Sequence, residues 1–73
     1  MGNETVKTYV INKKKYDIVG CWDEDTPEGK YDFFDVFDED GSCLNLGAPY
    51  YAIPSRVEVK ELIEELKKYD LLP

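Results

Sequence analysis

The 73-residue sequence contains no histidine, only two cysteines and no long hydrophobic run. Without histidine it lacks the usual proton shuttle and the usual base of a catalytic triad. Cys21 and Cys43 do not have the C-x2-C spacing of a zinc site, and the glycines form neither a dinucleotide-binding motif nor a P-loop. We therefore expect no enzymatic activity, no catalytic residues, no metal ligands and no cofactor.

Uninterrupted apolar segments are only a few residues long, whereas about 20 residues are needed to span a bilayer. The segment Met1–Glu4 has no basic region followed by an apolar stretch, so we expect no signal peptide. Two thiols in a chain without such a leader predict a reducing compartment, and hence a cytoplasmic location. No membrane association is expected.

The net charge of −7 is distributed unevenly along the chain. Residues 17–40 contain ten acidic residues and one lysine (−9), whereas residues 1–16 contain four lysines and one glutamate (+3). A segment this acidic repels nucleic acid and anionic membranes, so a charged partner should carry a basic or mixed-charge protein surface. The alternative is that the charge serves solubility alone.

Residues 5–11 and 15–22 are rich in β-branched and aromatic residues and predict a hairpin. Its register remains open, because a two-residue turn at Asn12–Lys13 and a longer one through Lys15 both give plausible pairings. A loop over residues 23–29 follows, and residues 30–37 predict a third strand.

The sequence Asp38-Glu-Asp-Gly41 predicts a type I turn with Gly41 in the left-handed position of a bulge. This turn would pair Phe37 with Cys43 and continue to Phe34 and Leu46, which adds a fourth strand. One face of the resulting hairpin would be wholly apolar, comprising Phe34, Val36, Leu44 and Leu46. Because Cys21 should lie beside Tyr31 or Asp32, we expect it about six residues, or ~20 Å, from Cys43, too far for a disulfide.

A C-terminal helix is predicted from the sequence Ser55-Arg-Val-Glu58, which matches a capping box, to about Tyr69 or Asp70. Its apolar stripe should pack on the apolar face of the second hairpin. Residues 1–73 are thus predicted to form a single acidic α+β domain. Its architecture is a four-stranded antiparallel β-meander followed by one C-terminal α-helix packed on one sheet face (ββββα).

Acidic residues should run along the second hairpin, with aromatic residues on the sheet face opposite the helix. Such a row can imitate the phosphates of a nucleic-acid strand, and exposed aromatics can supply binding energy. The alternatives are a solvated edge and a second small core in which Trp22, Tyr50 and residues 51–54 fold over this face. The predicted partner-binding residues are Asp23, Glu24, Asp25, Glu28, Tyr31, Asp32, Phe33, Asp35, Phe37, Asp38, Glu39 and Asp40.

The sequence favours a small non-enzymatic interaction module, such as an inhibitor or nucleic-acid mimic that occupies a basic surface of a nucleic-acid-binding protein. It is not expected to bind nucleic acid directly. One alternative is a homodimeric accessory domain built through the aromatic sheet face. Another is a carboxylate-based divalent-metal-binding or hydrolytic protein.

Overall fold

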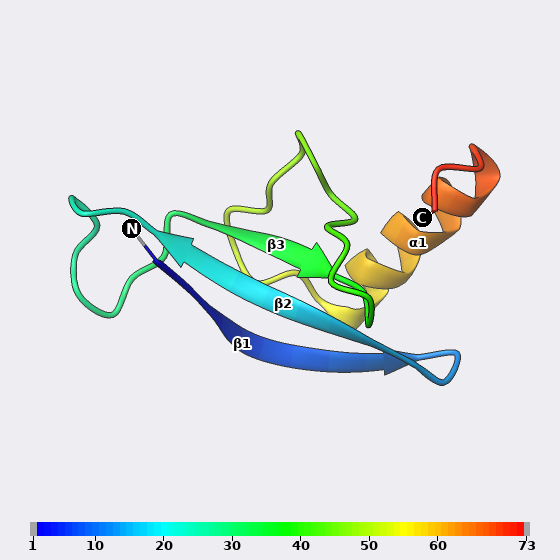
Figure 1. The fold of residues 1–73 in the computed structure, drawn as a ribbon, viewed down its shortest axis with the longest axis horizontal. Helices are drawn as coiled ribbons and strands as arrows, with labels where there is room; N and C mark the ends of the chain where they lie inside the picture. The colour runs from blue at the N-terminus through cyan, green and yellow to red at the C-terminus, as the bar shows by residue number, and fades with distance from the viewer. Residues whose placement is uncertain (1, 73) are drawn as a thin grey trace.

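The computed structural model describes residues 2–72, which form a three-stranded antiparallel sheet and one C-terminal helix (Figure 1). The strands are β1 (Gly2–Ile11), β2 (Lys14–Trp22) and β3 (Phe33–Phe37), in the order β1-β2-β3, and the helix is α1 (Arg56–Lys68). The described part measures 37 × 22 × 21 Å. At 13 residues and with a polar outer face, α1 is neither long nor apolar enough to cross a membrane.

The first hairpin uses the shorter of the two turns that the sequence allowed. Asn12 and Lys13 have φ angles of 52° and 67°, and Ile11 pairs directly with Lys14. Two consecutive left-handed residues give a turn whose twist matches that of the strands, and asparagine tolerates this conformation better than most residues. The register shifts once, between Thr5 and Lys7, where a bulge bends β1.

The predicted fourth strand does not form, so the ββββα architecture is not obtained. The second hairpin begins as expected, because Phe37 bridges to Cys43 and the Leu44 amide donates to the Val36 carbonyl. Beyond Leu44 the side chain of Asn45 turns inward and bonds the backbone of β3 in place of a strand. The chain leaves the sheet there, so Leu46, predicted to be in the core, is 82% exposed.

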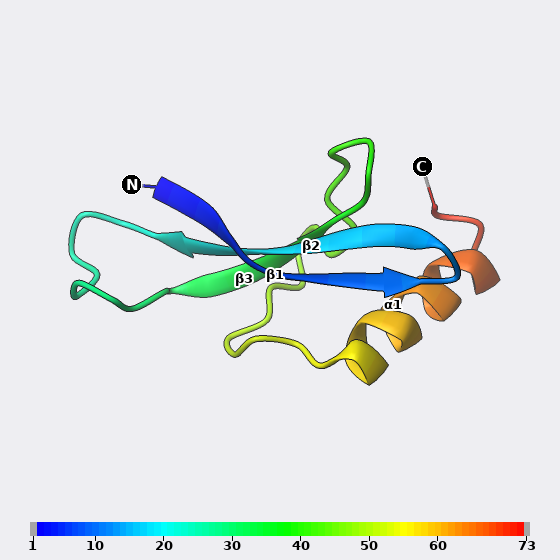
Figure 2. The same cartoon turned by 90° about the horizontal axis from the view of Figure 1, so that it is seen from below.

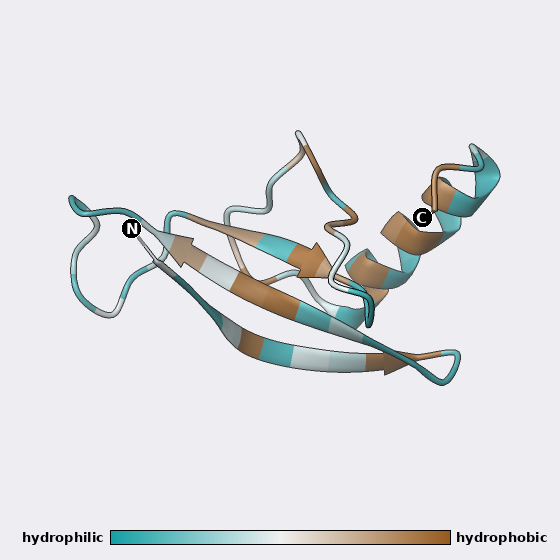
Figure 3. Ribbon diagram, viewed as in Figure 1, coloured by the Kyte–Doolittle hydropathy of each residue, from teal (hydrophilic) through white to brown (hydrophobic). Residues whose placement is uncertain are grey.

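The helix agrees closely with the prediction. Ser55 and Glu58 form the reciprocal hydrogen bonds of a capping box, and Tyr69 caps the C-terminus. Val59 and Ile63 are buried against the sheet, whereas Tyr69 is exposed. Figure 3 shows the apolar stripe of α1 and the apolar stretches of β2 and β3, which a polar segment interrupts in β3. The buried core consists of Tyr9, Ile11, Tyr16, Ile18, Phe34, Val36, Leu44, Val59 and Ile63.

Candidate protein-interaction surface

The two faces of the sheet differ in what covers them. Helix α1 and the chain leading into it lie on one side of the sheet (Figure 2). Side chains of β2 and β3 that alternate with the core residues point to the other side, which we call the open face. Three cross-strand pairs form it, and all their members are half-buried: Cys21 with Phe33, Val19 with Asp35, and Asp17 with Phe37.

Phe33, Asp35 and Phe37 therefore lie together on one face, as the alternation of β3 predicted. Segment 50–54 does not cover them. Tyr50 exchanges backbone hydrogen bonds with Phe34 and packs against the core, and Tyr51 is 79% exposed. The second small core considered from the sequence is absent from residues 2–72.

Tyr31 does not belong to the open face, and the prediction that grouped it with Phe33 and Phe37 was wrong. Its ring lies over Gly20, where an added Cβ atom would come within 2.5 Å of it. The ring packs against Phe34, and its hydroxyl donates to Glu4. This hydrogen bond raises the pKa of Tyr31 above its ordinary value. Tyr31 lies there because Gly20 has no side chain to occupy the space.

An acidic loop, residues 23–32, lies at one end of the sheet. Its fold depends on Asp23 and Asp32: the Asp25 amide donates to Asp23 Oδ1 at 3.2 Å, and the Thr26 hydroxyl donates to Asp32 Oδ2 at 2.7 Å. The loop and the start of the sheet surround an open hollow of about 470 Å³. The hollow is lined by Glu4, Trp22, Asp23, Glu24, Thr26, Pro27, Glu28, Gly29, Lys30 and Tyr31.

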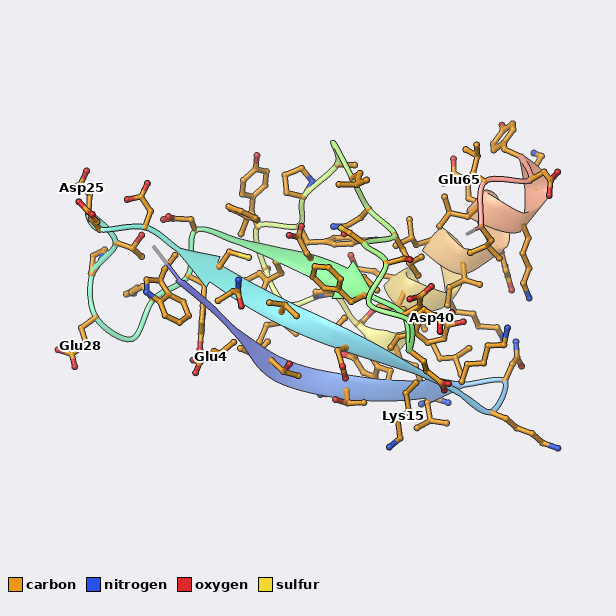
Figure 4. The ribbon with its side chains drawn as sticks, viewed as in Figure 1. Glu4, Lys15, Asp25, Glu28, Asp40 and Glu65 are labelled. Carbon is orange, nitrogen blue, oxygen red and sulfur yellow. The ribbon has the colours of Figure 1, made fainter. Side chains whose placement is uncertain are left out.

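Glu4 is an acidic residue of this end that sequence reasoning did not assign to the site. It comes from the start of β1 and lies opposite Gly20 across the first hairpin. The only signal was the hairpin register, which the sequence left open. Figure 4 shows Glu4, Asp25 and Glu28 gathered toward this end of the molecule.

The acidic turn, residues 38–40, lies at the other end and has a different environment. The Asp38 carboxylate accepts hydrogen bonds from the amides of Asp40 and Ser42, and Glu39 accepts one from the Lys15 amide. A hollow of about 180 Å³ brings residues 38–40 together with Lys14 and Lys15. The acidic row predicted along the hairpin thus ends in a region of mixed charge, because the first hairpin carries its lysines to the same end (Figure 4).

The acidic side chains that form hydrogen bonds in residues 2–72 accept them from backbone amides, hydroxyls or a thiol. Asp17, for example, accepts from the Thr8 hydroxyl at 2.7 Å, and Asp35 is 3.8 Å from the Cys21 sulfur. None of these bonds comes from a lysine or arginine side chain. Within residues 2–72, the acidic loop and the open face consequently present carboxylates that accept no hydrogen bond from a lysine or arginine side chain.

Cys21 and Cys43 are both free thiols. They are closer than the predicted ~20 Å, because Cys21 pairs with Phe33, four residues or ~13 Å along β3 from Phe37, the partner of Cys43. Burial and the neighbouring Asp35 raise the pKa of Cys21, and burial raises that of Cys43. Within residues 2–72, no three cysteine, aspartate or glutamate side chains converge as metal ligands would.

Comparisons of the chain with protein-family models, with curated proteins and with solved structures found no match.

Proposed function

We propose that this chain is a small non-enzymatic interaction protein that binds a basic or mixed-charge surface of a partner protein. In its most specific form, it acts in a reducing compartment such as the cytoplasm, as an inhibitor or nucleic-acid mimic that occupies the basic groove of a nucleic-acid-binding protein. The contact surface consists of the acidic loop and the adjoining open face.

The observation that carries this proposal is the position of carboxylates, to which no basic side chain of the described residues donates a hydrogen bond, beside half-buried aromatic rings. On the open face, Asp35 lies between Phe33 and Phe37 along β3, and Asp17 lies opposite Phe37 on β2. Phe33 adjoins the exposed Asp32 of the acidic loop. Aromatic side chains supply contact area at protein interfaces, while uncompensated charges of one sign steer an oppositely charged partner and accelerate association.

Within the acidic loop, Glu24, Asp25 and Glu28 are exposed and accept none of the hydrogen bonds that hold the loop together. Their substitution should therefore change charge without changing the fold. Glu61, Glu64 and Glu65 of α1 provide a matched control, because they are also exposed and removing their charges changes the net charge by the same amount.

The test is an affinity pull-down in which the immobilised chain captures proteins from a lysate of its source organism or that organism's host. The captured proteins are then eluted with increasing salt or with competing duplex DNA. We expect a basic protein that DNA displaces, and we expect the variant E24Q/D25N/E28Q to bind it roughly tenfold or more weakly. The variant E61Q/E64Q/E65Q should retain binding. Equal loss in both variants would show a general charge effect, and full retention in both would contradict the proposal.

A further inference from the structure

Strand β1 leaves one edge of the sheet free within residues 2–72, because it lies at the end of the order β1-β2-β3. The opposite edge is sealed. Phe34 of β3 exchanges backbone hydrogen bonds with Tyr50, and Val36 bonds to the Asn45 side chain and the Leu44 amide. The outer side of β1, which we call the free edge, extends over a ten-residue strand. An unpaired edge of this length is a template for another strand.

The backbone groups that point outward along the free edge follow from the pairing. Arg56 donates to the Val10 carbonyl from outside the sheet, so the backbone amide and carbonyl of Val10 and, by alternation, those of Thr8 point outward. The bulge shifts this alternation by one residue. On its other side the backbone groups of Thr5 and Asn3 point outward, because these residues lie opposite Val19 and Cys21, whose own backbone groups are directed toward β3.

The residues whose backbone groups point outward form a symmetric set. Antiparallel pairing of two β1 strands in one register sets Asn3 opposite Val10 of a second copy and Thr5 opposite Thr8 of that copy. Every such residue of one chain then faces one of the other, and each facing pair can exchange two hydrogen bonds once Arg56 releases the Val10 carbonyl. We propose that two copies of this chain associate through the free edge in this antiparallel register and form a continuous six-stranded sheet.

Charge along the free edge selects the antiparallel direction. Strand β1 begins beside the acidic loop and ends at the tip of the first hairpin, where Lys13 lies in the turn and Lys14 and Lys15 begin β2; we call these three residues the lysine turn. In Figure 4 Glu4 extends past the free edge near one end, with Glu28 on the loop beyond that end, and Lys15 extends past the edge near the other. Antiparallel pairing brings the lysine turn of each copy to the acidic end of the other, whereas parallel pairing would bring like charges together.

Arg56 limits this association, because its guanidinium occupies the Val10 carbonyl that a second strand would use. Removing the Arg56 side chain frees the Val10 carbonyl to pair with a second strand. Proline at Thr5 has the opposite effect, because it removes an outward amide that no pairing with β2 requires. The two substitutions therefore change association in opposite directions, which a dimer through the open face would not reproduce.

Sedimentation velocity over a concentration series measures the midpoint concentration, at which half of the chains are dimeric. We expect Thr5→Pro to raise this concentration at least tenfold relative to Thr5→Ala, and Arg56→Ala to lower it. Salt at about 500 mM should raise it relative to about 10 mM, because the attraction between the charged ends is screened. A wild-type chain that remains monomeric up to about 1 mM at low salt would overturn the proposal. So would a dimer that Thr5→Pro leaves unchanged.

Disulfide formation tests the register independently, and it remains informative if Thr5→Pro fails to fold. In a chain with Cys21 and Cys43 replaced by serine, the pair Thr5→Cys and Thr8→Cys should cross-link two copies, because paired positions lie about 5.5 Å apart between Cα atoms. The control pair Thr5→Cys and Lys7→Cys puts the second thiol on the other face. Equal cross-linking in both would overturn the register.

Discussion

Replacing Asn45 with alanine should lower the free energy of unfolding by about 2–4 kcal/mol. Asn45 is 4% exposed, and its Oδ1 atom accepts the Val36 amide at 2.9 Å. Its Nδ2 atom donates to the carbonyls of Phe34 and Ala48, both at 3.3 Å. Truncation leaves the Val36 amide buried without a partner, which costs about 1–3 kcal/mol, and the two longer bonds add roughly 0.5 kcal/mol each.

This loss is large for a chain of 73 residues, whose total stability should be about 4–11 kcal/mol at ~0.05–0.15 kcal/mol per residue. Urea unfolding, followed by Trp22 fluorescence and circular dichroism, measures this loss of unfolding free energy. The slope of the unfolding free energy against urea concentration should remain unchanged. Leu46→Ala is the control, because Leu46 is the next residue and is 82% exposed; it should cost less than about 0.5 kcal/mol. A similarly small cost for Asn45→Ala would refute the view that this side chain replaces a strand.

Three further predictions concern single side chains. Gly20→Ala should destabilise the fold by about 1–2 kcal/mol, because the new methyl group displaces the Tyr31 ring; the loss should nearly vanish in a Tyr31→Ala background, as measured by urea unfolding. Ser55→Ala should cost about 1 kcal/mol in the same assay, and an unchanged midpoint would argue against the capping box. Burial and the Asp35 carboxylate raise the pKa of Cys21, so Asp35→Asn should lower that pKa and increase the reaction rate with a thiol reagent at pH 8; an unchanged pH–rate profile would contradict this.

The elements that the sequence predicted well are those determined by local chemistry. The capping box at Ser55 and the glycine of the turn at Asp38–Gly41 act within a few residues, so their signals can be read without knowing the rest of the fold. The alternation along β3 was similarly sufficient to direct Phe33 and Phe37 away from the helix.

The elements that the sequence did not predict depend on long-range contacts. An asparagine after an apolar strand segment gives no sign that its amide will bond a neighbouring strand, so the predicted pairing from Cys43 to Leu46 runs through Asn45 as through any strand residue. Tyr31 departs from the alternation of β3 because it precedes the strand and is held by Gly20 and Glu4 from the first hairpin. Neither contact can be inferred before the register of that hairpin is known.

The acidic residues fall into two groups: those whose carboxylates hold the backbone by hydrogen bonds and those whose carboxylates do not. Only the second group can test whether the charge serves binding or solubility alone. Asp38 and Glu39 bond the backbone of their own turn and its neighbour, so their substitution would disturb the fold and could not isolate a binding role. Glu24, Asp25 and Glu28 have no such structural contacts among the loop hydrogen bonds. A requirement for solubility alone would be met equally by acidic residues on α1, so a difference between loop and helix variants of equal charge would be evidence for a specific partner.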